Sequence, residues 1–323
     1  MYNYYPLSCS AKINLYPVEL VEVEQIVIDR ELGSGEMMME SINNWSKALG
    51  GKLTSALKLA GLEKDSHQIV FNNDGLMGKF ASLKTIEDIE LFSKKYGLLG
   101  IQSPESAQVN SQSPAIRATL QPAYIFNNYG FSLLEPIELW MWHIAEVRKI
   151  LRLYDVVKKN SSDDQINEII EVKLHRGKFG SLDEDREITD RYFIHWAIGE
   201  PILLLPEFFE EKTMLEIARY TLAKILESHL SGGINIGIGE LISDPSTKVF
   251  KITEQRYSKY LVAAVYYDLW QKINDSRNIQ LCDNERCRLP LLKSGRKKYC
   301  NDACKQEAYR IRLEKKEMEG KNL

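Results

Sequence analysis

Four cysteines near the end of the chain constrain its fold more than any other feature of the sequence. Cys282, Cys287, Cys300 and Cys304 lie within one window of 23 residues, and the fifth cysteine, Cys9, stands alone near the start. A tight group of four cysteines is typical of a metal site, whereas disulfide frameworks need no such clustering. The sequence therefore predicts a metal centre in this part of the chain.

The spacing of the cysteines, C-x4-C-x12-C-x3-C, favours zinc as the metal. Two cysteine pairs a dozen residues apart suit one structural Zn²⁺ bound tetrahedrally by four thiolates, which leaves no open position for a substrate. Asn301 or Asp302 is expected to cap a helix that has Cys304 in its first turn. Along this helix Cys304, Ala308 and Ile311 are expected to face inward. A cysteine pair, a loop, a second pair and a helix make a treble-clef-like zinc finger.

The charge of the chain is divided unevenly between this tail and the rest. Residues 282–323 contain twelve Lys and Arg against seven Asp and Glu, whereas the preceding residues contain 30 basic and 38 acidic side chains. A zinc ion with four thiolates has a formal charge of about −2 and needs some neighbouring cations for itself. Residues 288–316 contain ten basic and three acidic side chains, which exceeds that need and favours contact with phosphate. The residues expected to bind nucleic acid are Arg296, Lys297, Lys298, Lys305, Tyr309, Arg312 and Lys316.

The rest of the chain is expected to be mainly α-helical with a small β component. Apolar residues recur at helical spacing in several segments, and β-branched residues flank Asp244-Pro245 as in a short hairpin. Helices are predicted near 42–59 and over 85–96, 136–159, 166–174, 211–229 and 257–273, and strands over 234–238 and 248–252. We expect an N-terminal α+β region over 1–102, a helical body with the short hairpin over 123–278, and the zinc finger with its basic helix over 279–323.

Several classes of function lack support in the sequence. The five histidines form no metal-binding helical pair, the glycines of residues 232–239 lack the Lys-Ser/Thr of a phosphate-binding loop, and no G-x-S-x-G motif occurs. We therefore predict that the protein is not an enzyme. No leader-like start and no run of eighteen apolar residues occurs, so we expect a cytoplasmic protein that does not span a membrane.

The tail sequence LCDNERCRLPLLKSGRKKYCNDACKQEAYRIR resembles the CGNR-type zinc finger of bacterial proteins that also carry a helical ABATE-like domain. Those proteins are described as stress-induced transcription regulators. The resemblance covers about forty residues. In it, the four cysteines match the zinc ligands, and residues 296–298 match the basic residues that precede the third cysteine. The Cys-Gly-Asn-Arg sequence itself has no counterpart here. The resemblance implies a DNA-binding finger attached to a helical body.

Together these features predict a transcription regulator whose finger contacts nucleic acid, with double-stranded DNA as the expected partner. The body is expected to sense a small-molecule effector or to form a homo-oligomer. The alternative is a protein-interaction adaptor, in which the same basic finger docks on an acidic partner.

Overall fold

The computed structural model describes residues 5–7, 10–25, 34–49, 51–60, 66–103, 129–177, 189–196, 201–204, 212–244, 249–274, 280–284, 286–288, 291 and 297–321. Residues 103–122, whose two Ser-Pro pairs are typical of a linker, lie almost entirely outside these ranges, as does Cys9.

The helices in the described part of the chain are α1 Ser34–Leu49, α2 Leu76–Ala81, α3 Ile86–Tyr96, α7 Ile137–Lys159, α8 Asp163–Asn167, α9 Met214–Leu230, α10 Leu261–Asn274 and α11 Asp302–Lys321, with a short 3-10 helix at Val23–Gln25. The strands are β1 Tyr5–Pro6, β2 Ala11–Leu15, β3 Val18–Glu22, β4 Ser55–Leu59, β5 His67–Phe71, β6 Leu134–Pro136, β7 Ile170–Gly177, β8 Thr189–Trp196, β9 Pro201–Leu204, β10 Ile234–Asp244 and β11 Val249–Ser258.

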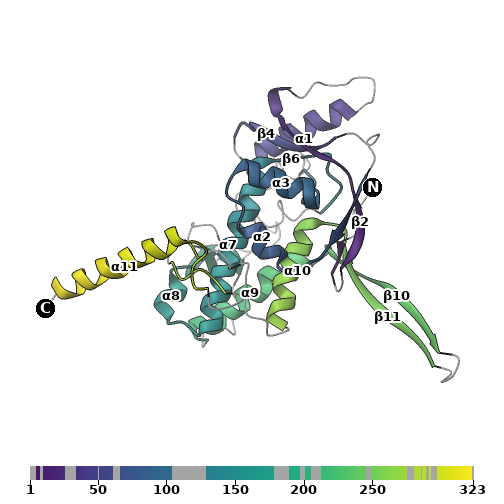
Figure 1. Ribbon diagram of the computed structural model, residues 1–323. Coiled ribbons are helices and arrows are strands. Elements are labelled where there is room, and N and C mark those ends of the chain that lie inside the picture. Colours follow the sequence, from purple (N-terminus) through teal and green to yellow (C-terminus); the bar gives the residue numbers. More distant parts are fainter. Residues whose placement is uncertain are drawn as a thin grey trace.

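Helix α7 is the centre of the body, and α2, α3, α8 and α9 all contact it (Figure 1). The apolar residues that recur at helical spacing along α7 are buried: they are Ile137, Trp140, Ile144, Val147, Leu151 and Tyr154. Helix α10 packs on α2 and α9, and all its residues from 261 to 269 are buried, so it is surrounded on every side. Helices α7 and α10 therefore form much of the core.

Local interactions define the ends of two of these helices. Thr85 and Asp88 form a capping box at the start of α3, because the backbone N–H of Asp88 donates to Thr85 Oγ1 at 3.2 Å and that of Thr85 donates to Asp88 Oδ2 at 3.1 Å. Helix α7 ends at Asn160, which takes up the left-handed conformation common at helix C-termini (φ 49°).

The fold class predicted from the sequence is wrong, because the chain is a mixed α and β protein with several small sheets. The four sheets have the orders β1-β11-β10, β2-β5, β3-β4-β6 and β7-β8-β9, and all their strand pairs are antiparallel. Strand β1 pairs with β11, and β4 pairs with β6, so the ranges 1–102 and 123–278 contribute strands to the same sheets. The hairpin of β10 and β11 is longer than expected and projects from the body (Figure 1).

Two helix predictions fail for identifiable reasons. The helix expected over 166–174 stops at Asn167, and β7 begins at Ile170. There, Ile170 and Val172 alternate with polar residues and pair with β8, which is a period of two rather than 3.6. Similarly, the helix expected near 42–59 lies earlier, at Ser34–Leu49, and residues 55–59 form β4. β-Branched and aliphatic residues fit either element, so pairing partners decide between them.

One buried carboxylate joins the start of α7 to the loop that follows α3. Glu135 is fully buried and accepts backbone N–H bonds from Leu99 at 2.9 Å, Gly100 at 2.8 Å and Ile101 at 3.2 Å, together with the indole N–H of Trp140 at 2.9 Å. Burial raises the pKa of Glu135 to about 7, and the four donors act in the opposite direction. This one side chain therefore satisfies four donors in the core.

Replacing Glu135 by alanine should lower the free energy of unfolding by about 3 kcal/mol or more, because four buried donors lose their acceptor at once. Chemical denaturation of the purified protein measures this loss. Glu227→Ala is the matched control: its carboxylate is exposed and, within the described ranges, forms an ion pair with Lys224 alone, so a change below about 0.5 kcal/mol is expected. Equal effects of the two substitutions would contradict the role assigned to Glu135.

Candidate metal centre and basic surface

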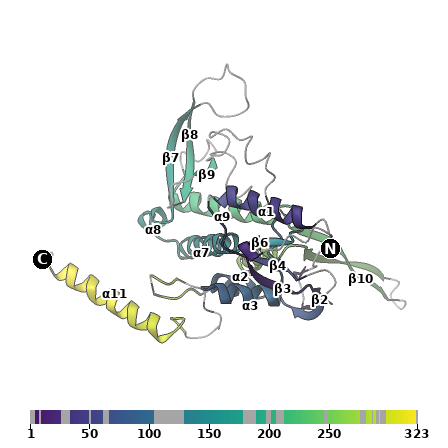
Figure 2. The same ribbon diagram turned by 90° about the horizontal axis from the view of Figure 1, so that it is seen from above.

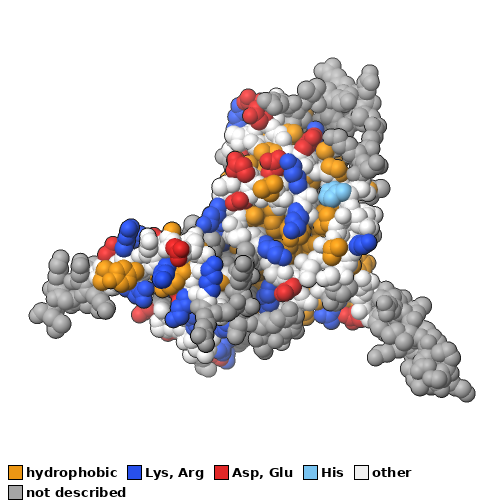
Figure 3. Space-filling model, viewed as in Figure 1, with side chains coloured by type: hydrophobic (Ala, Val, Ile, Leu, Met, Phe, Trp, Pro, Cys, Tyr) orange, Lys and Arg blue, Asp and Glu red, His pale blue; other side chains and the backbone are white. Residues whose placement is uncertain are grey.

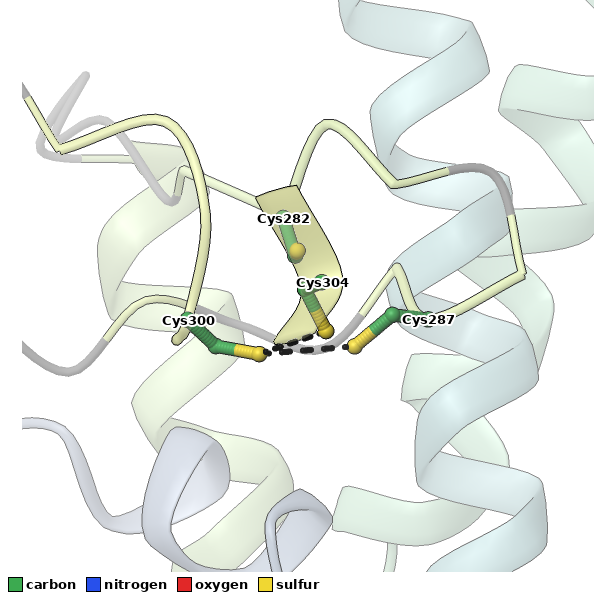
Figure 4. Close-up of side chains that lie close together, drawn as sticks. All are labelled: Cys282, Cys287, Cys300 and Cys304. Atoms are coloured by element: carbon green, nitrogen blue, oxygen red, sulfur yellow. Dashed lines mark hydrogen bonds between the residues drawn. The ribbon is translucent and has the colours of Figure 1, made fainter. Parts of the chain in front are cut away.

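The sulfur atoms of Cys282, Cys287, Cys300 and Cys304 point toward one another (Figure 4), and all lie within 4.8 Å of each other. The Sγ atoms of Cys300 and Cys304 are 3.2 Å apart, and those of Cys287 and Cys300 are 3.7 Å apart. A tetrahedral centre with metal–sulfur bonds of about 2.3 Å requires sulfur separations of about 3.8 Å. The four cysteines can thus hold one metal ion, as the sequence predicted.

Asn284 organises the first cysteine pair and fastens it to α11. Its carbonyl accepts the backbone N–H of Cys287 at 2.9 Å, and its side-chain oxygen accepts that of Arg286 at 3.1 Å, which closes the turn. The other end of the same amide donates to Glu307 Oε2 at 2.7 Å. Asn284 itself is fully buried, whereas Arg286 and Glu307 are in part exposed. The first pair therefore cannot move independently of the helix.

Asn301 caps α11 beside the second pair, as the sequence predicted. Its side-chain oxygen accepts the backbone N–H of Cys304 at 2.8 Å, which places Cys304 in the first turn of the helix. Cys304 and Ala308 are buried and Ile311 is partly buried, so the predicted inward face of α11 is also confirmed.

A backbone hydrogen bond connects two parts of the finger, and one buried side chain anchors the finger in the body. The N–H of Asp283 donates to the carbonyl of Lys298 at 2.8 Å, which brings the two cysteine pairs side by side. Leu281, immediately before the first cysteine, is buried and belongs to the main hydrophobic core. The C-terminal part of α11 extends away from the body (Figures 1 and 2).

The electrostatics of the four thiols favour a bound cation. Burial and the neighbouring thiols of Cys304 and Cys287 raise the pKa of Cys300. Burial also acts to raise the pKa of Cys304, but hydrogen bonds, chiefly from Cys300 and Cys287, lower it on balance. The sulfurs therefore resist losing all their protons together, and a metal ion supplies the positive charge that makes four thiolates stable.

Arg148, on α7, brings a positive charge from the body close to the metal centre. Its guanidinium donates to the backbone carbonyls of Ala81, at 2.8 Å, and of Leu83. Burial lowers the pKa of Arg148, and electrostatic attraction to Cys287 acts the other way. The finger is thus coupled to α7 by charge as well as by packing.

Most of the residues predicted to bind nucleic acid are on the surface. Lys297, Lys298, Lys305, Tyr309 and Arg312 are all exposed, whereas Arg296 and the side chain of Lys316 lie outside the described part of the structure. The guanidinium of Arg312 donates to the hydroxyl of Tyr299 at 3.3 Å, which places the loop before Cys300 against the side of α11. Figure 3 shows Lys and Arg side chains along α11 and the adjoining part of the body.

Sequence reasoning missed several contributors to this site. Asn284 carried a local signal, because an Asn three residues before a cysteine can close a turn through its side chain. Its bond to Glu307 and the approach of Arg148 depend on tertiary packing and have no local signal. Arg310 is a further exposed cation on α11, whereas Arg286 forms an ion pair with Glu307 at 3.3 Å.

Comparisons with protein-family models, curated proteins and solved structures gave no match. The resemblance to CGNR-type fingers therefore stays a prediction. None of the helices within the described ranges is both long and apolar enough to cross a membrane.

Substituting Cys300 by serine should abolish metal binding, because the remaining three thiolates cannot complete a closed centre. Elemental analysis of the purified protein should give about one metal ion per chain for the natural sequence and close to none for Cys300→Ser. The matched control is Cys9→Ser, which removes the cysteine outside the cluster and should retain the metal. Retention of a full complement of metal by Cys300→Ser would contradict the assignment.

Proposed function

We propose that this chain is a nucleic-acid-binding protein in which one structural zinc ion organises a basic finger that contacts double-stranded DNA. Zinc is favoured because four cysteine ligands in two pairs are typical of closed zinc sites. The same closure argues against catalysis at this centre, since no ligand position is left for a substrate. The metal would therefore support a surface rather than carry out chemistry.

The observation that carries the proposal is the hydrogen bond between Arg312 and Tyr299, because it unites two basic segments. Lys297 and Lys298 precede Tyr299 in the loop, and Lys305 and Tyr309 lie on the same side of α11 as Arg312, at positions i, i+4 and i+7. One continuous surface thus presents cations and an aromatic ring, the side chains that contact phosphate and bases.

The shape of the finger also suits a duplex. Helix α11 has 20 residues, which corresponds to about 30 Å of helix, and it projects from the body with its outer face uncovered (Figure 2). An α-helix is about 10–12 Å wide including side chains, and the major groove of B-form DNA is about 12 Å wide. The helix can therefore enter the groove while the loop lysines reach the phosphate backbone.

A second candidate, a protein-interaction finger, is favoured by two apolar side chains on α11. Tyr309 is 59% exposed and Leu313 is 43% exposed, and their spacing of four residues places them on one face of the helix. An acidic partner with an apolar centre would match this face. Leu313→Ser separates the candidates, because it should weaken a protein contact and leave affinity for DNA nearly unchanged.

Reversing two charges in the loop, with Lys297→Glu and Lys298→Glu together, should weaken binding to duplex DNA by more than about tenfold at low salt. The slope of log K against log salt concentration should also become shallower by about 2, because two phosphate contacts are lost. Fluorescence anisotropy of a labelled duplex, titrated with metal-loaded protein at several salt concentrations, measures both quantities.

The matched control is Lys94→Glu with Lys95→Glu, an adjacent pair of exposed lysines on α3 that should leave both quantities nearly unchanged. No binding of the natural protein at low salt would refute the DNA proposal. An unchanged salt slope in the loop variant would refute the assigned contact surface.

A further inference from the structure

A cavity of about 520 Å³ lies where the body meets the metal centre. Residues at the end of α7 and around α8 line one side, and Leu281 and Arg288 of the finger line another. Sites for small molecules in proteins commonly measure about 300–1,000 Å³. The cavity is therefore large enough for a small metabolite and is built from two separate parts of the chain.

Arg152 and Arg288 both line this cavity, and neither forms an ion pair with another described residue. Arg152 comes from α7 and Arg288 follows the metal ligand Cys287. Lys159, which also lines the cavity, is already bound to Asp155 at 2.7 Å. The two arginines are thus available to a ligand, and a guanidinium binds carboxylate or phosphate through two parallel hydrogen bonds.

The remaining lining is suited to hydroxyl groups. Ser161, Ser162 and Gln165 offer donors and acceptors, and Glu168 offers a carboxylate that accepts hydrogen bonds. The carboxylate of Glu168 would repel an anion that has no hydroxyl groups. An anion that also has hydroxyl groups can bind the arginines through its charge and donate hydrogen bonds to Glu168. The lining therefore selects a small, hydroxyl-rich anion.

The backbone at Arg288 supports a role for its side chain. Arg288 has a φ of 46°, in the left-handed region that glycine adopts at little cost and arginine does not. Its backbone N–H donates to the carbonyl of Asn284 at 3.0 Å, so the turn around the metal ligand fixes where the side chain begins. The metal centre thus positions one wall of the cavity.

We propose that this cavity binds a small hydroxylated anion, a sugar phosphate or a sugar acid, between Arg152 of the body and Arg288 of the finger. The bound ligand connects the two parts, so it holds the finger against α7. The site provides a way for a metabolite to control the finger.

Isothermal titration calorimetry on the full, metal-loaded chain tests this with glucose 6-phosphate and gluconate, and with glucose as the neutral control. The expected result is saturable binding of at least one of the two anions and none of glucose; which anion binds more tightly distinguishes phosphate from carboxylate recognition. Arg152→Gln and Arg288→Asn should each weaken that binding by about tenfold. Asparagine suits the left-handed conformation at position 288, so the turn is retained.

Arg310→Gln is the matched control, because it removes an exposed arginine of the finger that does not line the cavity. It should leave anion binding unchanged, and an equal loss would show general attraction to the basic surface and overturn the proposal. Absence of saturable binding, or binding unaffected by Arg152→Gln, would also overturn it. These measurements contain no nucleic acid, so their failure is distinct from failure of the DNA proposal.

Discussion

The tail of the chain is organised around four sulfur atoms that are placed to hold one metal ion. In the described residues after 280, the buried side chains are few: Leu281, Cys282, Asn284, Cys304 and Ala308. So small an apolar set cannot offset the entropy of ordering the chain, and small modules of this kind rely on a metal. The four sulfur atoms lie within 4.8 Å of one another, close enough to share such an ion. Without it, the cap at Asn301 and the turn at Asn284 would have little to hold them.

The metal centre also determines what surrounds it. Its thiolates need positive charge, which Arg148 of α7 supplies from the body, and Leu281 anchors the tail in the main core. The cations of the loop and of α11 lie beyond this inner layer and point into solvent. The cavity lined by Arg152 and Arg288 lies between the body and the finger. The boundary between these two parts therefore contains a space large enough for a small ligand.

Features that depend on residues close together in the sequence could be predicted from it, whereas features that depend on residues far apart in the sequence could not. The close approach of the four cysteines, the cap at Asn301 and the inward face of α11 follow from the spacing of residues near one another in the chain, and all three are confirmed. The strand at Ile170–Gly177 and the sheets that join residues 5–60 to the body depend on partners far away in the chain, so the class mainly α was wrong. The bonds of Asn284 to Glu307 and of Glu135 to three successive backbone groups are likewise products of tertiary structure.

X-ray absorption spectroscopy at the zinc edge of the purified, metal-loaded protein tests the closed four-sulfur centre directly. Four sulfur atoms at about 2.3 Å and no nitrogen or oxygen neighbour are predicted. A nitrogen or oxygen ligand at about 2.0–2.1 Å, or fewer than four sulfurs, would contradict it, because the centre would then be open or built from other residues.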